Sequence, residues 1–205
     1  MLEQLIPFLT ASILLTLSPG PDIVFVLVQG MSKGKKAGII TTLGLASGII
    51  VHTSLVAFGV SAIIKQSETL FLLIKIFGAL YLFYLAFRVF RSDSGFSLTS
   101  KSVVVDKKRH LFKQGFIMNV LNPKVTIFFL AFFPGFLWDP EGNTVFQFYV
   151  LGLLFMLQTI IIFGLVAILA GKISLFLNKH PSSGMVLKWI QIVVFVGIGI
   201  FILLP

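Results

Sequence analysis

The sequence has no cysteine and few charged residues. The absence of cysteine among 205 residues excludes disulfides, zinc sites built on thiolates and cysteine nucleophiles. Charged residues make up 11% of the chain, whereas soluble domains carry about 25%. The sequence also lacks an HExxH pattern and a pair of intramembrane aspartates. We therefore predict no metal site, no cofactor and no enzymatic activity.

Apolar residues fill most of the remaining sequence. They make up 57% of the chain, and the mean hydropathy is +1.05. They recur in runs of about 20 residues, the length of a helix that crosses a bilayer. We therefore predict an all-α, polytopic membrane protein with one transmembrane domain over residues 1–205. The six predicted spans cover residues 5–28, 38–64, 70–89, 114–137, 146–170 and 185–204.

The placement of the positive charge predicts the orientation in the membrane. The net charge is +9, and twelve of the 16 lysines and arginines lie in or beside the loops that follow spans one, three and five. Positive loops stay in the cytoplasm, so we predict a multi-pass protein of the cell inner (plasma) membrane with both termini outside. Charge confined to such loops indicates topology rather than nucleic-acid binding. A five-span topology with one re-entrant segment stays open.

The spans divide into two halves of three, residues 1–91 and 113–205. Because three is odd, the halves cross the membrane in opposite senses, as inverted repeats do. Residues 92–112 form a predicted cytoplasmic linker that is polar and rich in serine. Three basic residues near its end suit contact with anionic lipid headgroups, or they serve only to stop translocation. These residues are Lys107, Lys108 and Arg109.

Prolines interrupt spans one and four near their middles. Pro19 and Pro21 flank Gly20 in the first span, and Pro123 follows Asn122 in the fourth. Proline removes a backbone donor and clashes with the preceding turn. At 1.5 Å per residue, both breaks lie about 15 Å from the cytoplasmic ends of their spans. Broken helices at matching positions of two halves indicate a transporter binding site, although two unrelated kinks remain the simpler interpretation.

Ionisable residues follow both breaks directly. Asp22 follows Pro21, and Lys124 follows Pro123. Charges inside a membrane are costly, so such residues are paired or functional. A structural ion pair between the two is one interpretation. The other is a site for an amino-acid zwitterion, in which the helix ends and Lys124 receive the carboxylate and Asp22 receives the ammonium group.

Further polar residues inside the spans are candidates with weaker support. Asn119 and Asn122 would add neutral hydrogen bonds to the substrate site. Asp22 is the predicted carboxylate for exchange of a proton, and His52 either joins that proton path or only bonds a nearby carbonyl. A last group is predicted to serve a cavity or close packing. It comprises Gly44, Gly48, Lys75, Tyr81 and Gln158.

Two of these motifs resemble a known family. The first is Leu-Ser-Pro-Gly-Pro-Asp at residues 17–22, and the second runs from residue 112 to Asn-Pro-Lys at 122–124. Together with Gly78 and Tyr81 in span three, they resemble the lysine exporter and homoserine/threonine-resistance (LysE/RhtB) translocators. The resemblance implies secondary-active export of small amino acids of the homoserine/threonine, leucine or lysine class. Entry of protons would drive that export by antiport.

Two parts of the sequence depart from the family pattern: the central loop is long, and the end of span four has an unusual composition. Two questions also stay open. The end of span four is rich in phenylalanine, which we predict to be filler that faces lipid rather than the wall of a pocket. These residues are Phe128, Phe129, Phe132, Phe133 and Phe136. A passive channel or carrier for a small polar solute or ion is the alternative function, because broken helices serve those proteins too. Whether copies of the chain form a homo-oligomer also stays open.

Overall fold

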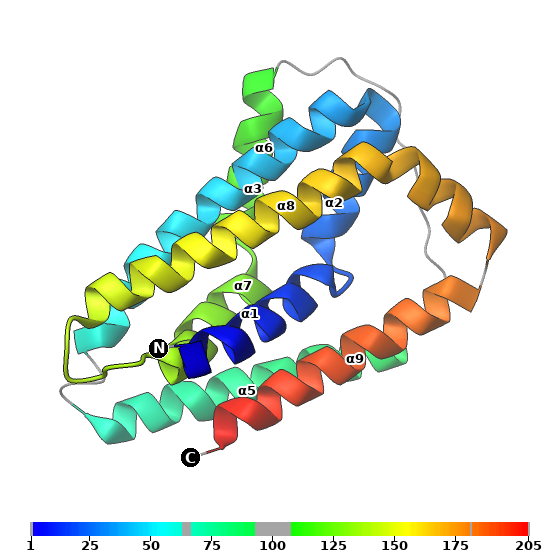
Figure 1. Cartoon of the computed structure of the whole chain (residues 1–205). Coiled ribbons are helices and arrows are strands. Elements are labelled where there is room, and N and C mark those ends of the chain that lie inside the picture. The colour runs from blue at the N-terminus through cyan, green and yellow to red at the C-terminus, as the bar shows by residue number, and fades with distance from the viewer. Residues whose placement is uncertain (1, 63–66, 93–107, 181, 205) are drawn as a thin grey trace.

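The structure is a computed structural model that describes residues 2–62, 67–92, 108–180 and 182–204. Every regular element in these residues is helical (Figure 1). The elements are α1 (Leu2–Leu17), α2 (Pro21–Lys33), α3 (Lys35–Leu55), α5 (Glu68–Arg91), α6 (Lys108–Val120), α7 (Pro123–Ile127), α8 (Thr144–Lys179) and α9 (Ser182–Leu203). A π-helical turn η1 (Val56–Val60) extends α3, and a π turn η2 (Phe128–Phe132) and a 3-10 turn η3 (Phe133–Phe136) follow α7.

Four unbroken helices and two bent pairs are long and apolar enough to cross a membrane. The unbroken spans are α3 with η1, α5, α8 and α9. The pair α1 and α2 bends by 56°, and α6 bends by 48° against the segment from α7 to η3. The prediction that spans one and four break at their prolines is therefore confirmed. The described helices allow four to six crossings, and the arrangement as two inverted repeats stays a prediction.

Two helices are longer than the sequence predicted. α6 begins at Lys108, inside the segment assigned to the linker, because the polar residues before span four contain no helix breaker. α8 continues to Lys179 and has 36 residues, where the prediction ended at residue 170. At 1.5 Å per residue it measures about 54 Å. This length exceeds a hydrocarbon core of about 30 Å, so its C-terminal part extends past the apolar region.

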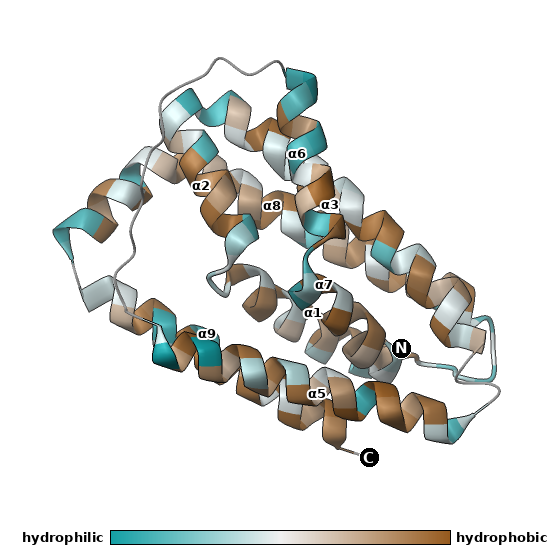
Figure 2. Ribbon diagram, turned by 180° about the vertical axis from the view of Figure 1, so that it is seen from behind, coloured by the Kyte–Doolittle hydropathy of each residue, from teal (hydrophilic) through white to brown (hydrophobic). Residues whose placement is uncertain are grey.

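The helices form two groups with α1 between them. α3 packs against both α6 and α8, and α2 lies against α3 and α8. α5 and α9 form a separate antiparallel pair, which Figure 1 shows on the opposite side of α1 from α8. Figure 2 shows that apolar residues dominate this pair, while hydrophilic residues gather at the far end of α6 and around the α8–α9 junction. Large apolar side chains such as Leu72 and Phe77 are exposed, as expected for helices that face lipid.

Glycines let α3 approach its neighbours closely. A methyl group on Gly44 would collide with the carbonyl of Phe112, and one on Gly115 would collide with the carbonyl of Thr41. Gly48 faces Asn119 in the same way. Because small residues let backbones meet, α3 and α6 are locked together along one line of contact. This line ends beside the break between α6 and α7.

The phenylalanine-rich segment is buried, so the prediction that it faces lipid is wrong. All five of its phenylalanines are at most 2% exposed. The ring of Phe129 stacks on that of Phe133 with centroids 3.9 Å apart, and Phe8 of α1 packs against Phe133 at 5.1 Å. Residues 128, 132 and 136, and residues 129 and 133, are spaced four apart, which places the five rings on one side of the helical segment. This side faces the interior of the protein. The rings form the core between α1, α5, α8 and α9.

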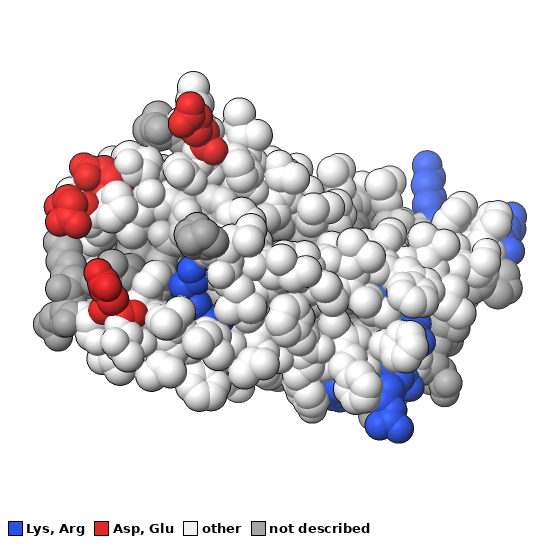
Figure 3. Space-filling view, turned by 90° about the horizontal axis from the view of Figure 1, so that it is seen from below, with Lys and Arg blue, Asp and Glu red and all other residues white. Residues whose placement is uncertain are grey.

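Charged side chains gather at the two ends of the molecule. Apart from Asp22, the acidic residues that the structure describes lie at the start of α1, at the start of α5 and just before α8. Basic residues lie at the ends of α2, α5 and α8 and at the start of α6. Figure 3 shows one face of this separation, with acidic atoms at one end and most basic atoms at the other. Both termini lie toward the end where α8 starts (Figure 1).

Candidate functional site

The two helix breaks meet in the interior of the molecule. α2 and α7 each begin at the break with a proline in the first turn, where its missing N–H would have no helical partner. The residues before these prolines, Gly20 and Asn122, are extended. The N-termini of the two short helices therefore both open onto the same region, and their backbone dipoles favour negative charge there.

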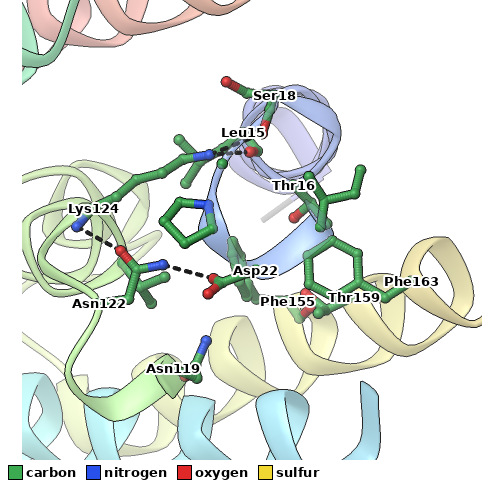
Figure 4. A pocket seen from close by; sticks show the side chains of 14 residues that line it. Leu15, Thr16, Ser18, Asp22, Asn119, Asn122, Lys124, Phe155, Thr159 and Phe163 are labelled. Atoms are coloured by element: carbon green, nitrogen blue, oxygen red, sulfur yellow. Dashed lines mark hydrogen bonds between the residues drawn. The ribbon is translucent and has the colours of Figure 1, made fainter. Parts of the chain in front are cut away.

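Asn122 links the two broken helices. Its Nδ2 donates to Asp22 Oδ2 over 2.7 Å, and its Oδ1 accepts from the backbone N–H of Lys124 over 3.0 Å. One side chain thus caps α7 and holds the carboxylate of α2 at the same time (Figure 4). Asp22 is 9% exposed and Asn122 is 7% exposed. The bond between them is therefore shielded from solvent and strengthened by the charge on the carboxylate.

Lys124 points away from Asp22 and caps the end of α1. Its Nζ donates to Leu15 O over 2.9 Å and to Ser18 O over 3.2 Å. Leu15 belongs to the last turn of α1 and Ser18 directly follows that helix, so both carbonyls lie at its negative end. No carboxylate in the described residues lies within 4.0 Å of this Nζ, so Asp22 and Lys124 are connected through Asn122 rather than by the direct ion pair that we considered from the sequence. Gly20 lies next to the ammonium group, and a Cβ at this position would make an ordinary van der Waals contact of 3.5 Å with Nζ.

A small cavity lies between the breaks and α8. Its open space is about 30 Å³, enough for one or two water molecules. Asp22 Oδ1, Asn119 Oδ1 and Ser18 Oγ belong to residues that line it, and all three atoms are buried without a hydrogen-bond partner. Buried polar atoms are nearly always paired. Asn119 Oδ1 is turned to Gly48 of α3, and the Ser18 hydroxyl can itself donate a hydrogen bond. The unpaired carboxylate oxygen of Asp22 therefore points to a ligand that donates hydrogen bonds.

His52 lies behind this cavity rather than in its lining. Its Nε2 is 3.1 Å from Asn119 O, and the same carbonyl accepts from the backbone N–H of Asn122 over 2.9 Å. His52 is 2% exposed and packs beside the ring of Phe129 at 5.6 Å between centroids. A continuous set of hydrogen-bonding groups thus runs from His52 through Asn119 and Asn122 to Asp22.

The structure separates the remaining predicted residues. Pro21 lines the cavity, whereas Pro19 faces an apolar hollow beside α8, and Pro123 lines a second cavity on the other side of Lys124. Tyr81 also lines the second cavity. Gln158 donates from Nε2 to Thr16 Oγ1 over 2.9 Å, one layer away from the first cavity.

Lys75 and the two glycines lie outside both cavities. Lys75 Nζ donates to the carbonyl of Leu204 over 2.9 Å and so caps the end of α9. Gly44 and Gly48 lie in the contact between α3 and α6. Of the predicted basic cluster, Lys108 and Arg109 lie in the first turn of α6, and Lys107 falls outside the described residues.

Several residues of the cavity were not predicted from the sequence. Ser18 lies inside the Leu-Ser-Pro-Gly-Pro-Asp motif, so its neighbours supplied a signal. Thr16 and Thr159 supplied none, because threonine hydroxyls inside helices usually bond to their own backbone. Among the residues that the structure describes, no three His, Asp or Glu side chains are placed to hold a metal ion.

Comparison with known proteins assigns the family. The LysE type translocator model matches residues 13–205. Membrane protein YrhP of Bacillus subtilis is 29% identical over 97% of this chain and 98% of its own. The homoserine/homoserine lactone efflux protein of Salmonella typhimurium is 28% identical over 86% of this chain and 84% of its own. The leucine efflux protein of Salmonella choleraesuis is 30% identical over 70% of this chain and 68% of its own.

No solved structure matches the chain. The family model nevertheless extends from the middle of α1 to the last residue, and it includes both breaks and the residues between them. The resemblance seen in the two sequence motifs is thereby confirmed. Because the match covers well over half of the chain, this protein is a member of the LysE type translocator family.

Proposed function

We propose that the protein exports small amino acids from the cytoplasm and binds them between the two helix breaks. Relatives named for efflux of homoserine, homoserine lactone and leucine support the substrate class. The observation that carries the proposal is the buried carboxylate oxygen Asp22 Oδ1, which has no hydrogen-bond partner and belongs to a residue that lines the cavity at the two breaks. An ammonium group offers hydrogen-bond donors and a positive charge, which matches an unpaired carboxylate oxygen.

The carboxylate of the same zwitterion has a complementary partner a few ångströms away. The N-termini of α2 and α7 open onto the site, and helix N-termini attract anions. Lys124 adds a full positive charge, which is now held by the carbonyls of Leu15 and Ser18. A carboxylate is a stronger acceptor for an ammonium group than a neutral carbonyl is. Bound substrate would therefore draw Lys124 away from α1.

The cavity is too small for an amino acid in this conformation, so transport requires a rearrangement. About 30 Å³ of open space holds water. Release of α1 by Lys124 frees the C-terminal end of that helix, and the two breaks supply joints around which half-helices can turn. This coupling of substrate binding to movement distinguishes a carrier from a passive channel.

Asp22 is the proposed site of proton exchange. It is the one carboxylate of the described residues that lies away from the acidic end of the molecule. His52 connects to it through the backbone of Asn119 and the side chain of Asn122. Proton entry from outside to Asp22 would release the ammonium group, because the neutral acid no longer attracts it. Export would then proceed as proton antiport.

Counterflow in proteoliposomes tests this proposal. Vesicles loaded with unlabelled L-homoserine or L-leucine should accumulate the same labelled amino acid, and an imposed pH gradient should drive net movement. Asp22→Asn should abolish the gradient-driven movement, and Glu68→Gln, which alters an exposed acid at the start of α5, should behave as wild type. Linear, unsaturable flux without counterflow would support the channel. Gradient-driven rates unchanged by Asp22→Asn would remove Asp22 from the coupling.

A further inference from the structure

A second cavity lies on the other side of Lys124 from the first. Its volume is about 340 Å³, and it lies between the helix breaks and the α5–α9 pair. Gly20, Pro21, Asn122 and Lys124 line both cavities. These four residues, which are common to the linings of the larger cavity and of the proposed substrate site, are here called the shared wall.

The larger cavity carries polar groups on two otherwise apolar helices. Tyr81, Arg88 and Ser92 come from α5 and its C-terminal cap, and Gln191 comes from α9. Tyr81, Leu85, Arg88 and Ser92 lie at intervals of four, three and four residues, so they form one stripe along α5. This stripe leads from the shared wall to the end of α5 where the basic residues lie.

Arg88 supplies the positive charge of this stripe. Its guanidinium lies 5.9 Å from the centre of the Tyr84 ring, one turn earlier on α5. Arg91, its neighbour at the same helix end, lies over Phe87 at 5.6 Å and does not line the cavity. The planar guanidinium of arginine matches a carboxylate with two parallel hydrogen bonds. Arg88 and Arg91 lie three residues apart at the same end of α5, and of the two only Arg88 lines the cavity.

We propose that this cavity is an entry subsite, in which Arg88 receives the carboxylate of an amino acid before it passes the shared wall. The substrate class rests on the proposed function. The subsite lies at the basic end of the molecule, which positive loops place in the cytoplasm, so it serves export. Tyr81 and Gln191 line the path between Arg88 and Lys124 and offer hydrogen-bonding groups along it.

The shared wall explains how the subsite connects with the central site. Lys124 extends across it and is held by two carbonyls of α1. A carboxylate that leaves Arg88 next reaches the Lys124 ammonium group. There it takes the place of the neutral backbone carbonyls as the hydrogen-bond acceptor, and its negative charge makes it the stronger acceptor. Gly20 lies beside this ammonium group, which is 3.5 Å from the position of a Cβ there. The carboxylate is thus passed from one cation to the next.

Transport kinetics from each side of the membrane test the subsite. Inverted membrane vesicles expose the cytoplasmic face, and export then appears as uptake of labelled L-homoserine or L-leucine. Arg88→Gln should raise the KM for this uptake roughly tenfold, the value of a lost charge-assisted hydrogen bond, with little change in maximal rate. Arg88→Lys should restore part of the affinity. In right-side-out vesicles, the KM of Arg88→Gln for exchange should equal that of wild type.

Arg91→Gln is the matched control, because it removes the same charge from the same helix end without touching the cavity. An equal KM for Arg88→Gln and Arg91→Gln would overturn the entry subsite. So would an equal KM shift on both faces, which would mean that Arg88 acts through the central site or the fold. Wild-type vesicles without saturable uptake of either amino acid would instead contradict the proposed function itself.

Discussion

Asn122 is the residue on which both halves of the candidate site depend. Its amide oxygen caps α7 by accepting from Lys124 N, and its amide nitrogen donates to Asp22 Oδ2. Without it, Asp22 Oδ2 would be buried with no partner from α7, and Lys124 N would lose its acceptor. A leucine or alanine could fill the space but could replace neither bond. The asparagine side chain therefore matters at this position for its hydrogen-bond donor and acceptor rather than for its volume.

Replacement of Asn122 should affect stability and transport together. Asn122→Ala removes a helix cap, worth about 1 kcal/mol, and leaves a buried carboxylate without its partner, which costs about 1–3 kcal/mol more. We expect a lower midpoint of thermal unfolding in detergent and loss of labelled homoserine or leucine counterflow.

Asn143 offers a matched control for this substitution. Its side chain caps α8 by accepting from Phe146 N over 3.0 Å, and it is exposed. Asn143→Ala should lose only the cap and retain counterflow. Equal effects of the two substitutions on stability and on transport would contradict the proposed role of Asn122.

At the scale of the elements, lysines on neighbouring helices cap the C-terminal ends of three helices. Lys124 caps α1, Lys75 caps α9 at Leu204, and Lys188 Nζ donates to the carbonyl of Ser92 at the end of α5 over 2.6 Å. α5 and α9 therefore cap each other. Cations at helix C-termini are favourable because they meet unpaired carbonyls and the negative end of the dipole.

Close contact with α3 holds α6 in place just before the break between α6 and α7. Gly44→Ala would force a methyl group into the backbone of Phe112, which cannot rotate out of the way as a side chain can. We expect a loss of about 1–3 kcal/mol from overpacking and a lower unfolding midpoint in detergent. The shifted α6 should also weaken transport, because Asn119 lies on it.

Gly164→Ala is the control for this prediction. No atom lies within 4 Å of a Cβ at Gly164, and alanine favours a helix over glycine by up to about 1 kcal/mol. Its midpoint should be unchanged or higher. If Gly44→Ala unfolds at a midpoint as high as that of Gly164→Ala, then α3 and α6 can move apart without loss of stability, which would contradict this prediction.

At the scale of the whole molecule, the separated charges predict one orientation in the membrane. The native chain has no cysteine, so a single introduced thiol reports its own location. Glu141 and Asn178 are exposed near opposite ends of α8. In intact cells, an impermeant maleimide should label Glu141→Cys and leave Asn178→Cys unlabelled until the membrane is opened. The reverse pattern would invert the orientation and turn the proposed exporter into an importer.

Much of this architecture could be predicted from the order of residues alone. The apolar runs predicted the positions of the helices, and Pro19, Pro21 and Pro123 predicted the two breaks, because proline removes a donor whatever surrounds it. Asp22, Asn119, Asn122 and Lys124 were expected to share a site, and they line one cavity. These inferences hold because they rest on local covalent geometry and on the cost of charge in hydrocarbon.

The sequence could not predict which way side chains turn. The phenylalanines after α7 were expected to face lipid, yet they form the core. Their four-residue spacing places them on one face of the segment, but it does not say whether lipid or protein covers that face. A direct ion pair between Lys124 and Asp22 was one of two interpretations of the sequence, and Lys124 instead caps α1. In the sequence, Arg88 and Arg91 are two positive charges near the same helix end, and nothing distinguishes them. The fold places Arg88, and not Arg91, in the lining of a cavity.

The chain by itself therefore determined a helical membrane protein with two interrupted spans and ionisable groups at the interruptions. Tertiary structure decided the partners: Asn122 bridges the breaks, lysines cap neighbouring helices, and four residues are common to the linings of two cavities. The physical reason is that proline and hydrophobicity act on their own segment. A hydrogen bond between residues 100 positions apart, such as that of Asn122 with Asp22, exists only when packing brings their helices together.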